Sequence, residues 1–119
     1  MPAVPSLDLS RRTALVTGVS RRSGIGFAIA SHLLTLGLRV FVQSWRPHDE
    51  EQTWGQDLEP VSKLVDDLAS IGPEVGHSEI DLGAASGSLR LLEEARTLLG
   101  HIDILVLNHA RRRTRASRS

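Results

Sequence analysis

The sequence contains no cysteine and no tyrosine, and Lys63 is its one lysine. Without cysteine there is no disulfide, no thiolate nucleophile and no cysteine zinc site, which fits a reducing compartment, so we expect a cytoplasmic location. A mechanism that needs a tyrosine hydroxyl beside a lysine ammonium is excluded for this chain. The sequence predicts no catalytic residue. It also predicts no metal site, because its five histidines lack metal-ligand spacing.

Aromatic residues make up only 3% of the chain. The core must therefore consist of leucine, valine, isoleucine and alanine, which suits a buried sheet flanked by helices. With 40% hydrophobic and 24% charged residues, the composition is that of an ordinary globular domain. No run of about eighteen apolar residues occurs, and the first ten residues lack a signal-peptide core. The sequence therefore predicts neither membrane insertion nor secretion.

The net charge of zero conceals an asymmetry along the chain. Residues 1–110 hold nine basic and 14 acidic residues, a net charge of −5, whereas residues 111–119 hold five arginines and no acid. We expect a folded domain over residues 1–110 and a disordered arginine-rich tail over residues 111–119. The tail either binds nucleic acid or another acidic surface, or is a sequence accident such as a shifted reading frame or an early stop. We favour the accident, so nucleic acid is not an expected partner.

Four apolar runs predict strands, over Thr13–Thr17, Leu38–Gln43, Glu74–Ile80 and Ile102–Leu107. Between them lie three segments with apolar residues at helical spacing: Ile25, Ala28, Ile29, Leu33 and Leu36; then Leu58, Val61, Leu64, Val65 and Leu68; then Leu89, Leu92, Ala95 and Leu99. Strict alternation of strand and helix requires right-handed crossovers. The sequence therefore predicts an α/β fold, a partial Rossmann-type parallel sheet with helices on both faces.

The most informative stretch is TGVSRRSGIGFAIA, residues 17–30, between the first strand and the first helix. A helix N-terminus presents unpaired N–H groups and a partial positive charge, which stabilise a phosphate or pyrophosphate. Glycines at 18, 24 and 26 let the backbone turn sharply, approach the phosphates and pack the helix on the strand. We interpret the loop as dinucleotide-binding, the alternative being a purely structural turn. A Walker-type loop is disfavoured, because Ile25 follows Gly24 where a Lys-Ser or Lys-Thr pair would start.

The residues after the second strand bear on which dinucleotide binds. An acid there, about twenty residues past the glycine loop, would bind the adenosine ribose hydroxyls. The sequence instead reads Ser44, Trp45 and Arg46, with no acid before Asp49. Arg46 can pair with a 2′-phosphate, and Arg21 or Arg22 in the loop can add a second guanidinium. We therefore favour NADP over NAD, the alternative being that all three arginines are solvated surface charges.

Three motifs in this order resemble the short-chain dehydrogenase/reductase family, most nearly its bacterial 3-oxoacyl carrier-protein reductase type. TGVSRRSGIG matches the family's glycine motif, although Gly18 and Gly24 lie six residues apart rather than the usual four. The pair Asp81 and Leu82 matches the acid-apolar pair after the third strand. DILVLNHA, residues 103–110, matches the family's DILVNNAG, with leucine replacing the first asparagine and Asn108 keeping the second.

The resemblance implies an NADP-dependent oxidoreductase that transfers hydride between its cofactor and a small carbonyl or alcohol substrate. It implies an adenine pocket at Asp81 and Leu82 and a central strand end at Asn108. The 2′-phosphate contact is the one predicted for Arg46 from the residues after the second strand. It assigns the diphosphate turn to Gly18, Ser20, Arg21, Arg22, Gly24, Ile25 and Gly26.

The match stops at residue 110, whereas the family continues into residues that supply a catalytic serine, tyrosine and lysine. None of these is present, so we expect a truncated cofactor-binding domain that is inactive by itself. The alternative is a non-catalytic nucleotide-binding or interaction module that pairs with another chain, or with itself, through the open edge of the fourth strand, Ile102–Leu107.

Overall fold

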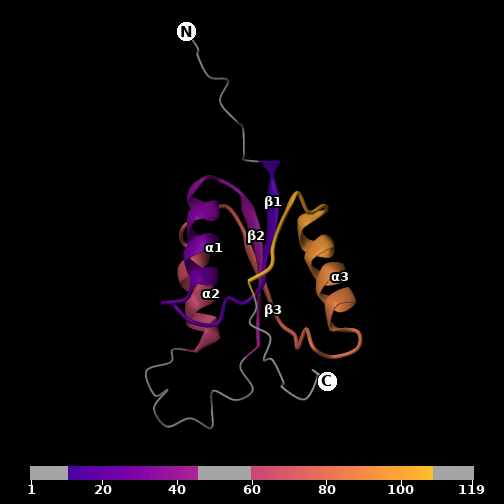
Figure 1. Ribbon diagram of the computed structural model, residues 1–119. Coiled ribbons are helices and arrows are strands. Elements are labelled where there is room, and N and C mark those ends of the chain that lie inside the picture. Colours follow the sequence, from indigo (N-terminus) through magenta and orange to yellow (C-terminus); the bar gives the residue numbers. More distant parts are fainter. Residues whose placement is uncertain (1–10, 46–59, 109–119) are drawn as a thin grey trace, which may run out of the picture.

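The computed structural model describes residues 11–45 and 60–108 of the chain. Strands and helices alternate throughout these residues (Figure 1). The strands are β1 (Thr13–Val16), β2 (Arg39–Ser44), β3 (Val75–Glu79) and β4 (Ile104–Val106), and the helices are α1 (Ile25–Thr35), α2 (Val61–Ala69) and α3 (Gly87–Leu99). The predicted alternation and the α/β class are confirmed.

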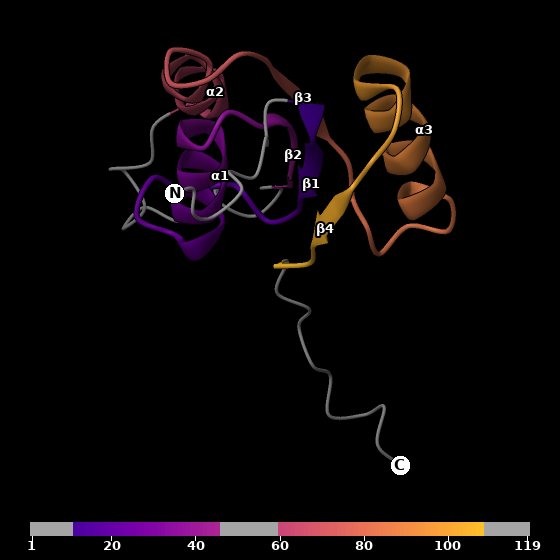
Figure 2. The ribbon, with the colours of Figure 1, turned by 90° about the horizontal axis from the view of Figure 1, so that it is seen from above.

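All strand pairs are parallel, and the order across the sheet is β3-β2-β1-β4. Helices α1 and α2 cover one face and α3 covers the other (Figures 1 and 2). The chain moves outward from β1 to β3 and then crosses the opposite face to reach β4, which gives the predicted doubly wound sheet. The order reverses between β1 and β4, and sheets of this kind bind ligands beyond the carboxyl ends of the strands at such a point.

The core consists of two aliphatic layers, one on each face of the sheet. On the α1 and α2 face, Ala14 and Val16 of β1 belong to one cluster with Leu34 of α1. On the α3 face, Leu15 of β1 clusters with Ala95 of α3. Successive side chains of a strand point to opposite faces, so a strand covered on both sides is apolar throughout.

In the described part of the chain, no helix is long and apolar enough to cross a bilayer.

The predicted apolar face of the first helix was wrong in part: Ile29 and Leu33 pack against the core cluster, but Ile25 and Leu36 do not lie on the buried face. Ile25 is 68% exposed and Leu36 is 45% exposed. The buried residues of α1 are instead Gly26, Ala30 and Leu34. Because apolar residues occur nearly all round this helix, their spacing did not distinguish the face that packs on the sheet.

The predicted face of the third helix was wrong in its first half. Leu89 and Leu92 are 60% and 38% exposed. The face that packs on the sheet repeats every fourth residue and comprises Gly87, Leu91, Ala95 and Leu99. For the second helix the prediction was correct at Leu64 and Leu68, which are buried. Leu58 lies outside the described residues.

Strand β4 is shorter than the predicted Ile102–Leu107. It pairs with β1 only from Ile104 to Val106. Beyond that point, the Asn108 N–H donates to the Thr17 hydroxyl at 2.8 Å instead of to a strand carbonyl. The reason is Gly18, whose φ of 75° turns β1 away from its neighbour and ends the ladder.

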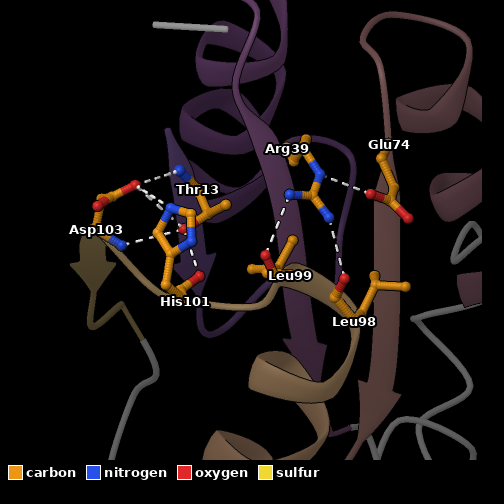
Figure 3. Close-up of polar contacts among 7 residues, drawn as sticks. All are labelled: Thr13, Arg39, Glu74, Leu98, Leu99, His101 and Asp103. Atoms are coloured by element: carbon orange, nitrogen blue, oxygen red, sulfur yellow. Dashed lines mark hydrogen bonds and ion pairs between the residues drawn. The ribbon is translucent and has the colours of Figure 1, made fainter. Parts of the chain in front are cut away.

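Polar contacts at the amino ends of the strands hold α3 in place (Figure 3). The Arg39 guanidinium donates to the carbonyls of Leu98 and Leu99 at 3.0 and 3.1 Å. Its Nε pairs with Glu74 Oε1 at 2.7 Å. Arg39 thus satisfies carbonyls that the last turn of a helix leaves without intrahelical partners.

The turn between α3 and β4 is attached to the start of β1 in the same region (Figure 3). The Thr13 N–H donates to Asp103 Oδ2 at 2.9 Å, and the Thr13 hydroxyl donates to the His101 carbonyl at 2.6 Å. The hydrogen bond from the Thr13 backbone lowers the pKa of Asp103. These contacts lie at the amino ends of the strands, at the opposite edge of the sheet from the carboxyl ends.

Candidate functional site

The chain turns sharply after β1, and the first backbone N–H groups of this loop form hydrogen bonds within the protein. The Gly18 N–H donates to Gln43 Oε1 at 2.8 Å, and the Val19 N–H donates to the Gln43 carbonyl at 2.9 Å. The Gly24 N–H donates to the Arg21 carbonyl at 3.1 Å. Gly18 and Gly24 therefore shape the loop and do not direct their own N–H groups to a phosphate.

Gly26 sits in close contact between α1 and the ends of β1 and β4. A β-carbon at this position would lie 2.5 Å from the Gly18 carbonyl oxygen and 2.8 Å from Asn108 Nδ2. Both distances are too short for any side chain. Glycine at 26 is therefore required by packing, since it lets the first turn of α1 approach the central strands.

Gly24 immediately precedes α1, and neither its backbone angles nor its neighbouring atoms require a glycine at this position. Its φ of −85° and ψ of 163° suit any residue. A β-carbon would meet only Arg21, at 3.4 Å from its carbonyl oxygen. A β-carbon at 24 would thus be tolerated by the rest of the described protein.

The first turn of α1 offers a donor set for an anion. The N–H groups of Ile25, Gly26 and Phe27 have no intrahelical acceptor, because the first turn of any helix leaves its donors without one. Among the described residues no side chain caps this end, and the first turn carries no acid. Together with the helix dipole, these N–H groups stabilise a negative charge placed before the helix.

The side chains of the loop point in different directions. The Ser20 hydroxyl accepts the Trp45 N–H at 3.5 Å, which ties the loop to the end of β2. Arg22 forms an ion pair with Asp67 of α2, and its guanidinium lies 5.2 Å from the centre of the Phe27 ring. The hydrogen bond from Arg22 lowers the pKa of Asp67. Arg21 is exposed. The structure thus places Arg22 between Asp67 of α2 and the Phe27 ring in the first turn of α1, with its charge paired to Asp67.

The end of β2 holds a residue that the sequence analysis did not single out. Gln43 is only 2% exposed, and besides accepting from Gly18 it donates from Nε2 to the Ile80 carbonyl at 2.7 Å. The sequence signal for this residue is its polarity at the end of the apolar strand LRVFVQ. Arg46 lies outside the described residues.

Ser44, which follows Gln43, faces the other side of the sheet. Its hydroxyl lies 2.7 Å from His77 Nε2 on β3, and Ser44 is fully buried. Burial lowers the pKa of His77 by disfavouring the charged imidazolium. The pair therefore joins two strands as a neutral hydrogen bond near neutral pH.

The end of β3 carries the predicted adenine contacts. Asp81 Oδ1 accepts the Gly83 N–H at 2.8 Å, and the Asp81 carbonyl accepts the Ala84 N–H at 3.1 Å. A β-carbon on Gly87 would lie 2.1 Å from that carbonyl oxygen, so α3 starts directly against Asp81. Leu82 packs onto the core cluster of the α3 face. Asp81 and Leu82 are thus held firmly at the carboxyl edge.

Asn108 closes the site on the β4 side. Besides its backbone contact with Thr17, its side-chain Nδ2 lies 3.5 Å from the Gly18 carbonyl oxygen. The structure therefore brings Gly18, Gly26 and Asn108 together. Gly24 and Ile25 lie beside Gly26 at the start of α1. Asp81 and Leu82 belong to the end of β3 and connect to this group through Gln43.

The described residues fit a dinucleotide. Each loop glycine meets a separate requirement: a left-handed turn at 18, an open approach at 24 and close helix packing at 26. These are the three requirements of a strand-turn-helix that binds a pyrophosphate. Within residues 11–45 and 60–108 there is no cluster of three or more metal-ligating side chains.

Comparisons with known families and curated proteins agree with this arrangement. A family model described as short chain dehydrogenase matches residues 12–118. The chain is 33% identical over 111 residues to a probable tetrahydroxynaphthalene reductase of Zymoseptoria tritici, covering 91% of this chain and 37% of that protein. It is 35% identical over 100 residues to the short chain dehydrogenase claC of Passalora fulva, covering 84% and 33% respectively.

Solved structures give the same result. A hydroxysteroid dehydrogenase from Escherichia coli superposes with a TM-score of 0.67 at 25% identity, covering 87% of this chain and 38% of that one. A putative short-chain alcohol dehydrogenase from Sinorhizobium meliloti superposes with a TM-score of 0.63 at 30% identity, covering 82% and 34%. The chain spans about a third of the length of the curated relatives that it matches.

Proposed function

The chain belongs to the short-chain dehydrogenase family, and from this premise we propose that it is the cofactor-binding part of an NADP-dependent oxidoreductase. The bound cofactor supplies hydride exchange between its nicotinamide and the carbonyl or alcohol carbon of a small substrate. Reduction is the proposed direction, because relatives of this chain carry the names of reductases.

The observation that carries the proposal is that the described fold does not require glycine at position 24. Neither its backbone angles nor its neighbours require glycine. A diphosphate that approaches the start of α1 does require it, because a side chain at 24 would stand between the phosphates and the helix N–H groups. The N–H groups of Ile25 and Gly26 then hold the diphosphate, with Ser20 and Arg21 beside them in the loop.

We assign the remaining cofactor contacts to residues that follow the carboxyl ends of the strands. Asp81 and Leu82 bind the adenine, and Asn108 shapes the nicotinamide side of the crevice. Arg46 pairs with the 2′-phosphate of NADP. Arg22 adds a second charge only after it exchanges Asp67 for the phosphate.

Hydride transfer to a substrate requires groups that this chain does not supply. The resemblance assigns proton transfer to a tyrosine assisted by a lysine, and the chain has no tyrosine. Its one lysine, Lys63, lies exposed on α2. We therefore propose that this chain binds the cofactor and is inactive by itself.

Titration calorimetry of the purified chain with NADP⁺ and with NAD⁺ tests the proposal. We expect saturable binding of both, with NADP⁺ bound about tenfold more tightly, and we expect Arg46→Ala to remove that difference. A folded chain that binds neither cofactor at millimolar concentration overturns the proposal. Equal affinity for the two cofactors overturns the preference for NADP.

A second candidate function rests on the edge strand β4, which is the last strand of the sheet on its side. Leu105 and Leu107 are 50% and 66% exposed. An open groove of about 460 Å³ lies at Leu105, lined by Leu92, Arg96, His101, Ile102, Asp103 and Leu105. An apolar edge of this kind pairs readily with another strand, including one from a second copy. Light scattering after size exclusion should show a monodisperse complex, whereas a stable monomer contradicts this candidate.

For the cellular location we propose the cytoplasm. The absence of cysteine supports it, because a reducing compartment gives no benefit to disulfides. Fractionation of the producing cells with an antibody against the chain tests the location directly.

A further inference from the structure

Gln43 occupies a place where the sheet otherwise holds apolar side chains. It is 2% exposed, and Phe41, two residues before it on the same face, belongs to the core cluster. A buried carboxamide is costly unless its donor and acceptor are both engaged. Here Oε1 accepts the Gly18 N–H and Nε2 donates to the Ile80 carbonyl. The side chain therefore bridges three neighbouring strands at their carboxyl ends.

The two groups that Gln43 joins belong to the two halves of the proposed cofactor site. Gly18 forms the left-handed turn that leads to the start of α1, and its carbonyl contacts the position of Gly26. Ile80 immediately precedes Asp81 and Leu82, which we assign to the adenine. Two successive amides after β1, those of Gly18 and Val19, bind Gln43 through its side chain and its backbone.

An apolar residue of the same size would leave both partners without their hydrogen bonds. The Gly18 N–H and the Ile80 carbonyl are then free to reorient, and the turn loses the contact that sets its direction. A carboxylate would keep the acceptor for Gly18 but oppose the Ile80 carbonyl with a second acceptor. Only a group that accepts on one side and donates on the other satisfies this geometry.

We propose that Gln43 is a positioning residue for the cofactor, holding the diphosphate turn and the adenine segment at a fixed separation. The inference rests on the proposed function. It goes further by assigning affinity for the cofactor to a side chain that does not itself touch it. Because Gln43 acts through its hydrogen-bond polarity, the carboxyl of a glutamate at this position replaces it when protonated and fails to replace it when ionised.

The test compares Gln43→Leu and Gln43→Glu with the unmodified chain by NADP⁺ calorimetry, at about pH 5.5 and about pH 8.5. A buried carboxyl has a raised pKa, and these two pH values are chosen to lie below and above it. We expect Gln43→Leu to weaken binding about tenfold at both pH values. We expect Gln43→Glu to weaken it about tenfold at the higher pH and to return to within about threefold of the unmodified chain at the lower pH. Glu79 and Asp81, which flank Ile80, are present in every variant, as is Glu94 of α3, which accepts from the hydroxyl of Ser78, the β3 residue paired with Gln43. The ratio to the unmodified chain at each pH removes their own titration.

A matched control separates positioning from a general loss of stability. Thr13→Val removes the hydroxyl contacts with the His101 carbonyl and the Asp103 N–H at the opposite edge of the sheet and should lower the melting temperature without changing NADP⁺ affinity. Circular dichroism confirms that each variant is folded before titration. If both Gln43 variants bind like the unmodified chain, or if the Gln43→Glu loss is the same at both pH values, the inference is wrong. If the unmodified chain binds no cofactor, the proposed function itself fails.

Discussion

Gly26 in the first turn of α1 lies directly against Gly18 at the end of β1. A β-carbon on Gly26 would lie 2.5 Å from the Gly18 carbonyl oxygen, a backbone atom that cannot rotate away. We therefore predict that Gly26→Ala lowers the free energy of unfolding by about 1–3 kcal/mol and also weakens NADP⁺ binding, because α1 must shift. Urea unfolding and calorimetry measure the two effects. Unchanged stability would show that the contact between helix and strand is loose.

Gly24→Ala is the matched substitution two residues earlier. The new methyl group meets ordinary contact distances and acceptable backbone angles, so the free energy of unfolding should stay within about 0.5 kcal/mol. NADP⁺ affinity should fall at least about tenfold, because the methyl group stands where the diphosphate approaches. A variant that binds as tightly as the unmodified chain would contradict the assigned approach of the cofactor.

Arg39 holds the end of α3 through two backbone carbonyls and Glu74. Arg39→Met keeps most of the apolar stem and removes these charged hydrogen bonds, so we predict a loss of about 2 kcal/mol in urea unfolding. Glu74→Gln, the control, removes the negative charge of the more exposed partner and should cost less than about 1 kcal/mol. Equal losses for the two variants would mean that the ion pair, and not the cap on α3, provides the stabilisation.

The lowered pKa of Asp103 leads to a prediction of how the stability of the fold changes on acidification. Its pKa lies below the ordinary value of 3.8 because the Thr13 N–H favours the carboxylate. A lowered pKa in the folded state stabilises the fold above pH 3.8, and that contribution is lost as the pH falls through the folded-state pKa. We predict that Asp103→Asn is less stable at neutral pH and loses less of its stability on acidification. Thermal melts from neutral pH to about pH 3 measure this, and parallel curves for the two proteins would contradict it.

The centre of the sheet could be predicted from sequence because β1 and β2 are buried on both faces. Such strands are apolar throughout, and the runs around Leu15 and Phe41 stand out from the helical segments. The exposed positions of Leu89 and Ile25 could not be predicted. A helix with apolar residues on several sides does not reveal in its spacing which side meets the sheet.

The candidate site was predictable only where it is local. The glycines and Asn108 belong to short motifs, and the structure brings them together at the ends of β1 and β4. The bond between Gln43 and Ile80 spans 37 positions, and the pair between Arg22 and Asp67 spans 45. No local pattern encodes contacts at such separations, because the folded sheet alone makes these residues neighbours.

The central claim is that the N–H groups at the start of α1 bind the cofactor diphosphate. The most direct measurement is an NMR titration of the ¹⁵N-labelled chain with NADP⁺, following the backbone amides. We predict that the signals of Ile25, Gly26 and Phe27 shift together and saturate at one dissociation constant, while the amide of Lys63 on α2 stays in place. Unmoved signals at the start of α1 in a folded chain, or shifts confined to other parts of the sheet, would contradict the account.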